Sequence, residues 1–323
     1  MSCKVIFFFI SASLLSTSLA TQGTVADDSV SRQSLEDAWW TGPIVAASAA
    51  TLPEGHFLLE PYFYDVIQAG RFDSQGDRRS ASHNQYLGSQ TYFNYGLTDT
   101  VLIGVIPRFG YQRLAGGQSS TSLGLADLTL QGQVRLNKFD EQRRAPTLSF
   151  NVSETLPTGQ YDRLQTFGNG LGAGSYATAF SLYSQTFFWM EDGRIVRARL
   201  DVTYTSSTEA SIHDTSVYGT TTGFRGTAAP GDGYLANLAA EYSLTQNWVL
   251  ASDLVWQMQA NTKIVSVSGV RQNSGESQVL FVVPAVEYNL NDRLGVICGA
   301  RIAAAGRNAS ASVTPVAAIN YVF

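Results

Sequence analysis

The amino-acid sequence predicts an all-β fold, a closed transmembrane antiparallel β-barrel of about twelve strands. Three observations lead to this prediction: apolar residues recur at every second position, short and long connections alternate, and the chain ends on an aromatic residue. The final stretch PVAAINYVF places Ala317, Ile319, Tyr321 and Phe323 on one face of a strand. Because chain ends of water-soluble domains are usually polar and frayed, this face calls for an apolar surrounding.

The predicted strands are recognised by the alternation of apolar and polar side chains. The clearest window is IVRARLDVTYT, in which Leu200, Val202 and Tyr204 share one face and Arg199 and Asp201 share the other. The windows GYLANLAAEYSL and NWVLASDLVWQM repeat this pattern. Helical periodicity fits none of them, and no second long apolar run follows the N-terminal one. The sequence therefore does not predict a bundle of transmembrane helices.

The connections between the predicted strands differ in length at the two ends of the barrel. The turns GLTD, LTQN and LNDR are short, whereas stretches such as AGRFDSQGDRRSASHN and ANTKIVSVSGVRQNSGE are long and polar. Short turns at one end and long loops at the other are typical of outer-membrane barrels. An even number of strands then places both termini at the short-turn, periplasmic end. A soluble β-sandwich, the alternative fold, gives no reason for this sorting.

Aromatic side chains on the apolar faces are expected to form two belts, one at each membrane interface. The belt beside the short turns comprises Phe57, Tyr95, Tyr242, Trp248, Tyr288, Tyr321 and Phe323, and the belt beside the long loops comprises Phe109, Phe180, Tyr204, Tyr234 and Trp256.

The N-terminus has the features of a secretory signal peptide over residues 1–20. MSCK is short and basic, VIFFFISASLLSTSLA is apolar, and Ser18 and Ala20 are small residues at suitable cleavage positions. A retained transmembrane anchor is the alternative, but the apolar run is short and interrupted by serines. The rest of the chain divides into an N-terminal periplasmic or plug segment, residues 21–54, and the barrel, residues 55–323.

Within residues 21–54, a short helix could begin at Ser34 and end before Gly42. Trp39 and Trp40 need an apolar surrounding, which either the barrel lumen or the periplasmic interface could supply. The sequence leaves both locations open.

Composition excludes several classes of function. Charged residues make up only 15% of the chain, the formal net charge is −5 and no basic cluster occurs, so nucleic acid is not an expected partner. Once Cys3 leaves with the signal peptide, Cys298 is the single cysteine and no internal disulfide can form. His56, His83 and His213 are scattered along the chain, so we expect no metal site and no cofactor.

Two stretches resemble sites of chemistry. GNGLGAG, residues 168–174, is similar to a phosphate-binding glycine loop, but it precedes a strand instead of opening a helix, which favours a flexible loop. His213 lies beside Asp214 and near Ser211, which makes it the best hydrolase candidate. A nucleophile needs a base within hydrogen-bond reach, however, and a solvated loop histidine is the simpler interpretation.

Several stretches carry a resemblance to a known family. TGPIVAASAATLPEGHFLLEPYFY, LPTGQYD and GLGAGSYATAFSLYSQTFF, together with the aromatic C-terminus, resemble the outer-membrane proteins grouped as the putative MetA-pathway of phenol degradation family. The resemblance extends from about Trp40 to the end of the chain. It implies a porin-like barrel of the Gram-negative outer membrane that passes small, often aromatic or hydrophobic compounds, and it supplies no catalytic residues.

Charged residues on the polar faces of the strands are expected to line the lumen, because charges persist in such a chain only where water or partners meet them. This lining could form an open pore with both signs of charge, or a network of ion pairs that fills the interior. The candidate pore-lining residues are Glu60, Arg108, Asp127, Arg135, Arg197, Arg199, Asp201, Glu241, Asp253, Glu287 and Arg301.

We therefore expect a channel, not an enzyme, for passive uptake of small solutes, aromatic or hydrophobic ones among them. The alternatives are an outer-membrane hydrolase centred on His213 and a structural barrel whose loops bind a partner or a surface polysaccharide. The expected partners are outer-membrane lipid, small-molecule solutes and the barrel assembly machinery, which would recognise the C-terminal strand ending at Phe323.

Overall fold

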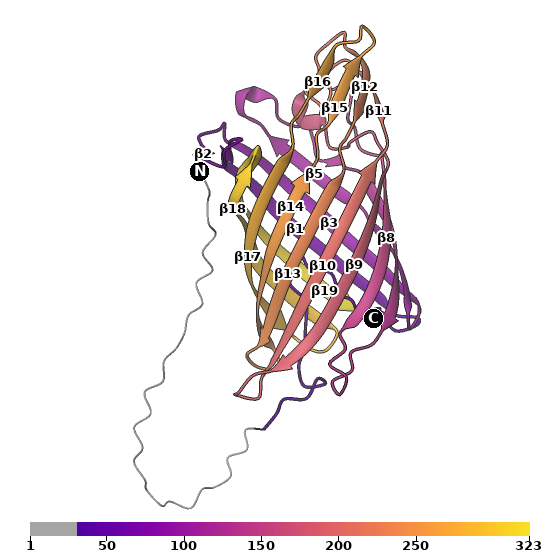
Figure 1. The fold of residues 1–323 in the computed structure, drawn as a ribbon, viewed down its shortest axis with the longest axis vertical. Helices are drawn as coiled ribbons and strands as arrows, with labels where there is room; N and C mark the ends of the chain where they lie inside the picture. Colours follow the sequence, from indigo (N-terminus) through magenta and orange to yellow (C-terminus); the bar gives the residue numbers. More distant parts are fainter. Residues whose placement is uncertain (1–30) are drawn as a thin grey trace, which may run out of the picture. The chain divides into compact units, whose positions relative to one another are not determined.

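The computed structural model describes residues 31–323 and confirms the predicted closed antiparallel β-barrel (Figure 1). The predicted signal peptide, residues 1–20, lies outside the described residues. The barrel has twelve strands when β4 and β5, which are separated only at Pro107, count as one. In chain order they are β1 (Phe57–Phe72), β3 (Asn84–Thr98), β4 (Val101–Ile106), β5 (Arg108–Arg113), β7 (Leu128–Asn137), β8 (Thr147–Leu156), β9 (Ala177–Trp189), β10 (Ile195–Ser207), β13 (Gly233–Ser243), β14 (Trp248–Gln259), β17 (Ser277–Asn289), β18 (Leu294–Arg307) and β19 (Ala309–Val322).

The barrel closes where the last strand pairs with the first. The amide of Phe57 donates to the carbonyl of Phe323 at 2.8 Å, and the amide of Phe323 donates back to the carbonyl of Phe57 at 2.9 Å. The two rings stack with centroids 5.8 Å apart, and Phe323 keeps 54% of its surface exposed on the outer face. Closure satisfies the backbone groups of both edge strands, which a membrane interior would otherwise leave unpaired.

The outer face is apolar and the inner face is polar or tightly packed. Along β10, Leu200, Val202 and Tyr204 are exposed on the outside, whereas Arg199 and Asp201 are buried on the inside. The aromatic residues near the long loops, Phe109, Phe180, Tyr204, Tyr234 and Trp256, are all exposed in the same way. No helix within residues 31–323 is long and apolar enough to cross a membrane.

The turns sort by length at the two ends, with one exception. The connections β3–β4, β7–β8, β9–β10, β13–β14 and β17–β18 lie at the same end as Phe57 and Phe323. The opposite end carries the long loops, but also the tight β18–β19 connection, where Asn308 alone separates the strands with a φ of 47°. Asparagine adopts this left-handed conformation more readily than most residues.

Two of the long loops build a second, four-stranded sheet beyond the barrel end (Figure 1). Its strands are β11 (Ala210–His213), β12 (Arg225–Ala229), β15 (Lys263–Ser266) and β16 (Arg271–Asn273). A small core of Ile212, Ala228 and Ile264 holds it together. The sequence alternation did not predict this sheet.

The remaining elements are short and lie in other long loops: β2 (Arg78–Arg79), β6 (Gly124–Leu125) and the 3₁₀ turns η1 (Ala115–Gly117) and η2 (Phe167–Asn169). In the β1–β3 loop, the guanidinium of Arg79 donates to the carboxylate of Asp73 at 2.8 Å and lowers the pKa of that carboxyl.

Candidate functional site: the lumen and the segment that crosses it

A charged cluster lies on the inner wall of β10, β13, β14 and β17. Arg197 donates through Nε to Glu241 Oε2 at 2.7 Å and through Nη2 to Glu241 Oε1. The Nε atom of Arg199 lies 3.2 Å from the same carboxylate. The fully buried members of the cluster are Glu241, Asp253 and Glu287, and the guanidinium groups of Arg197 and Arg199 are nearly as well covered.

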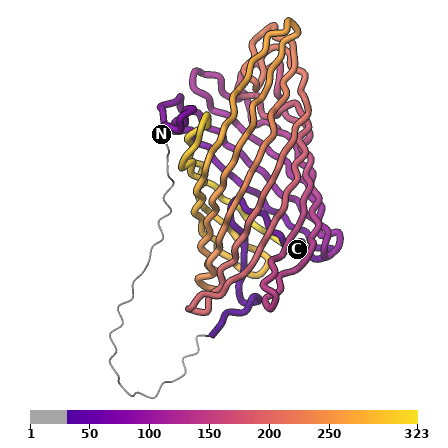
Figure 2. The backbone as a smooth tube through the Cα atoms, in the orientation of Figure 1, coloured from indigo at the N-terminus to yellow at the C-terminus, as the bar shows by residue number. Residues whose placement is uncertain are grey.

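The segment before β1 runs through the lumen at the short-turn end, as the indigo tube in Figure 2 shows. Three wall carboxylates accept hydrogen bonds from its backbone amides. Glu287 of β17 accepts from Thr41 at 2.8 Å and from Gly42 at 3.2 Å. The other two are Asp253 of β14, which accepts from Ala46 at 2.9 Å, and Asp201 of β10, which accepts from Ala47 at 2.7 Å.

Wall donors bind the carbonyl groups of the same segment. Arg199 Nη1 donates to Ala46 O at 2.9 Å, and Gln133 Nε2 of β7 donates to Ser48 O at 2.9 Å. Ser149 of β8 donates to Ala49 O. Since β17 and β7 lie on opposite sides of the barrel, residues 39–51 cross the whole lumen. Hydrogen bonds from strands on both sides of the barrel therefore anchor this segment along its length.

The predicted short helix from Ser34 is not formed; these residues make an irregular turn. Trp40 lies in the lumen, where the guanidinium of Arg197 sits 4.5 Å from its ring centre and Phe187 lies 6.4 Å away. The carbonyl of Trp39 accepts from Asn289 Nδ2 at 3.2 Å. The cation–π contact places Trp40 directly over the charged cluster.

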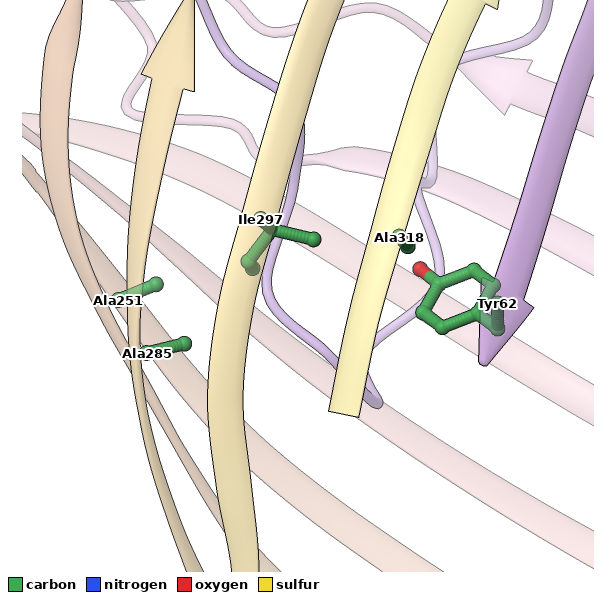
Figure 3. Packing of buried hydrophobic residues seen from close by; sticks show 5 residues of the cluster. All are labelled: Tyr62, Ala251, Ala285, Ile297 and Ala318. Atoms are coloured by element: carbon green, nitrogen blue, oxygen red, sulfur yellow. The ribbon is translucent and has the colours of Figure 1, made fainter. Parts of the chain in front are cut away.

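The apolar part of the segment rests on an apolar part of the wall. Ile44 packs against buried side chains of β14, β17, β18, β19 and β1, and Val45 continues this contact along β17. Figure 3 shows five of these wall residues on neighbouring strands: Tyr62, Ala251, Ala285, Ile297 and Ala318. A second buried group lies beyond them and comprises Val255, Phe281 and Val283.

Three more of the predicted lining residues lie on inward faces outside the cluster. Glu60 of β1 accepts from Asn320 Nδ2 at 3.0 Å, and Arg108 of β5 donates to Thr129 at 3.1 Å. Arg135 lies half-buried on the inward face of β7. These three are not joined to the charged cluster by any ion pair among residues 31–323.

Arg301 and Asp127 have different roles. Arg301 of β18 donates to Gln257 at 2.8 Å, and its guanidinium lies 3.7 Å from the ring centre of Phe281. Asp127 precedes β7 at the long-loop end, where its carboxylate accepts from the amides of Gly159 and Ala173. It thus organises the β8–β9 loop, which includes the glycine-rich residues 168–174.

The hydrolase candidate is not assembled. His213 Nδ1 lies 3.4 Å from Asp162 Oδ2, and Asp214 instead accepts from the amide of Gly223 at 2.8 Å. No hydrogen bond joins Ser211 to His213 in the described part of the chain. Residues 31–323 also contain no group of histidine, cysteine and carboxylate side chains that could hold a metal ion.

Sequence reasoning missed the inward-facing tyrosines of β1 and β3: Tyr62, Tyr64, Tyr86 and Tyr92. A signal was available, because Gly88 and Gly110 stand inside strands, where glycine often marks a close approach of another group. It also missed the polar partners of the segment, which carry no charge and so do not stand out in a strand.

Comparisons with known proteins agree with the geometry. A scan against protein families matches residues 65–314 to the family described as putative MetA-pathway of phenol degradation. A search of the curated proteins finds no match.

One solved structure shares the fold at a TM-score above 0.5. The COG4313 outer membrane channel from Pseudomonas putida F1 is 16% identical, with a TM-score of 0.65 over 86% of this chain and 98% of that chain. The β domain of the Bordetella autotransporter BrkA (12% identity, TM-score 0.48, 84% and 100% coverage) and the P. putida toluene transporter TodX (12%, 0.39, 88% and 94%) are more distant.

The closed barrel and its apolar outer face are those of a protein of the Gram-negative outer membrane. Since the family match spans most of the chain, this protein belongs to the putative MetA-pathway of phenol degradation family.

Proposed function

We propose that this barrel is a passive channel that admits small apolar or aromatic solutes across the outer membrane. The observation that carries the proposal is the two-sided lumen. Its wall on β14, β17 and β18 carries an apolar stretch beside the buried Asp253 and Glu287, with Val283 and Ile297 fully buried against the N-terminal segment. A channel for hydrophilic solutes is expected to be polar all round, whereas this wall favours a solute with an apolar body.

Residues 39–51 restrict the passage at the short-turn end. They cross the lumen without being part of the barrel ladder, and wall side chains hold them by hydrogen bonds and by apolar packing against Ile44 and Val45. Such contacts can be released without breaking any strand pairing. We infer that a solute passes when this segment shifts, and that the barrel itself stays rigid.

Uptake of two dyes tests the proposal. The apolar dye 1-N-phenylnaphthylamine fluoresces once it enters cell membranes, and hydrophilic nitrocefin reports leakage through a periplasmic β-lactamase. Cells that express the parent protein should accumulate the apolar dye faster than vector cells while nitrocefin hydrolysis stays unchanged. Equal dye entry in both strains would contradict an apolar channel, and faster nitrocefin entry alone would indicate a hydrophilic pore.

We further infer that the chain acts without catalysis, because His213 makes only a loop contact with Asp162. Purified protein should therefore cleave neither p-nitrophenyl esters nor phospholipids above the rate of a His213→Ala variant. A rate difference between these two samples would restore the hydrolase alternative.

We also propose that residues 1–20 are a cleaved signal peptide, that residues 21–54 form the plug segment, and that the barrel assembly machinery recognises the last strand. Support for the last point is the exposed ring of Phe323 beside Tyr321, with centroids 5.2 Å apart at the barrel seam. Deleting Phe323 should lower the folded protein in outer-membrane fractions without changing synthesis. An Ile319→Ala variant, which trims the same outer face, is the control. Unchanged levels would mean that the terminal ring is incidental.

A further inference from the structure

Two tyrosine rings of the inner wall lie in spaces that only glycine leaves free. Tyr64 of β1 covers Gly88 of β3, its direct partner across the strands, and a Cβ at Gly88 would stand 2.3 Å from the ring. Tyr86 covers Gly110 of β5, its diagonal neighbour, and a Cβ at Gly110 would stand 2.4 Å from the ring. Each ring therefore lies down against the barrel wall instead of projecting into the lumen.

Four tyrosines in two contacting pairs form a track on this wall. Tyr62 and Tyr92 meet edge-on with centroids 5.8 Å apart, and Tyr64 and Tyr86 lie 5.9 Å apart at a 45° tilt. Tyr62 is buried beside Ile44 of the segment that crosses the lumen, whereas the other three are only half-buried. The track thus runs from that segment toward the long-loop end.

Polar groups flank the track at the end nearer the segment that crosses the lumen. Gln90 Nε2 is 3.3 Å from the hydroxyl of Tyr92, and Arg108 stands opposite Gln90 on the neighbouring strand. Glu60 stands opposite Tyr92. A hydroxyl group on a ligand would find both donors and acceptors within this set.

Tyr64, Tyr86 and Tyr92 are only partly covered, so each keeps some accessible surface on the inward face of the barrel. A tyrosine that served only to fill the core would be covered on both faces, as Tyr62 nearly is. An aromatic ligand gains from offset or edge-on contact with such faces beyond what its apolar area supplies. A saturated ring of the same size gains only the area term.

We propose that Tyr64, Tyr86 and Tyr92 form a stacking site for an aromatic ring that carries a hydroxyl group. This inference rests on the proposed function and names where in the lumen its solute binds. The glycines at 88 and 110 are part of the site, because they allow the rings to lie flat.

A matched pair of probes tests the site. Phenol and cyclohexanol share size and hydroxyl but differ in the aromatic face, and each is titrated calorimetrically into the folded barrel in detergent, with detergent alone as reference. Phenol should bind about two- to tenfold more tightly than cyclohexanol. Equal affinities in the parent would overturn the proposal without any variant.

Variants locate the effect. Tyr64→Leu with Tyr86→Leu should abolish the phenol preference and leave cyclohexanol binding within about twofold, whereas the Tyr→Phe pair should keep the preference. Gly88→Ala should reduce it by displacing the Tyr64 ring, and Gly132→Ala, on the outer face of β7 where a Cβ meets nothing within 4 Å, is the control for a strand glycine replaced without a clash. A preference that survives the Leu pair would overturn the site.

The dye assay separates this inference from the function on which it rests. Dye uptake together with equal phenol and cyclohexanol affinities would refute the stacking site and leave the channel standing. Absence of dye uptake would refute the channel whatever the titrations give. Folding of every variant is checked by the gel shift between unboiled and boiled samples.

Discussion

The inner wall of β10, β13, β14 and β17 and the wall of β1, β3 and β5 face each other across the lumen, and they use their side chains differently. On the first, Glu241, Asp253 and Glu287 are at most 1% exposed and all make hydrogen bonds. On the second, Tyr64 and Tyr92 are half-buried and keep part of their rings free. The charged wall binds the chain's own N-terminal segment, whereas the tyrosine wall keeps accessible surface that a passing solute could contact.

The two walls should also respond differently to substitution. Buried charges are costly to desolvate and are tolerated only when each has its partner. Removing one partner therefore leaves a buried charge unpaired and should lower the stability of the folded barrel. Partly exposed tyrosines are uncharged and have no such desolvation cost, so their replacement should change solute binding more than folding.

The largest expected effect comes from reversing the arginines of the charged wall. Arg197→Glu with Arg199→Glu would place two new carboxylates beside Glu241, and breaking a buried ion pair costs about 3–5 kcal/mol. The folded band on an unboiled gel should disappear at a markedly lower temperature. Arg143→Glu, at an exposed short turn, is the control. An unchanged melting temperature would mean that the pairs do not stabilise the barrel.

Deleting residues 39–51 should have the next largest effect, this time on conductance. The deletion empties the short-turn end of the lumen and leaves Asp201, Asp253 and Glu287 without their amide partners. Single-channel conductance should rise several-fold, and selectivity should move toward cations because these carboxylates then face water. Conductance equal to that of the parent would show that the segment does not restrict the passage.

A smaller effect is expected when single acceptors on the charged wall are changed. Asp201→Asn and Asp253→Asn keep an oxygen that can accept from Ala47 and Ala46, but they lose the charge, so local stability should fall by about 1 kcal/mol. Hydrogen exchange of the amides in residues 41–47 measures it, and Asp140→Asn in an exposed turn is the comparison. Hydrogen exchange at the parent rate in both variants would show that these carboxylates do not anchor the segment.

The smallest effect is expected outside both walls, at His213. Its side chain is partly exposed where it meets Asp162, and the amide of residue 213 would keep its 3.0 Å hydrogen bond to Asp162 after His213→Ala. The free energy of unfolding should change by less than about 0.5 kcal/mol. Gel melting and dye uptake check this, and a loss of uptake would assign the loop a part in gating.

Much of the fold could be predicted from the sequence because barrel strands leave a local signal. Alternation in IVRARLDVTYT, the short turns and the aromatic C-terminus each report on neighbouring residues only, and together they predicted the closed barrel that the structure confirms. The β18–β19 turn at Asn308 escaped this reasoning, since a single residue between two strands leaves no loop to recognise.

The site was less accessible to prediction because it depends on which strands become neighbours. Arg197 and Glu241 could be placed on inward faces, but their pairing follows from the alignment of β10 with β13, and nothing local specifies that alignment. The threading of residues 39–51 is set by polar partners such as Gln133 and Ser149, which look like ordinary strand residues. Tyr64 and Gly88 likewise acquire meaning only as a pair.

The four-stranded sheet beyond the barrel has a consequence for protein engineering. Its two middle strands, β12 and β15, come from different loops and pair with each other from Gly226 to Ala229. Shortening either loop alone would strip a partner from the other and leave a bare strand edge in the external medium, a template for aggregation. Loop grafting or epitope insertion on this barrel should therefore treat the two loops as one unit, with the exposed β15–β16 turn after Val267 as the insertion point.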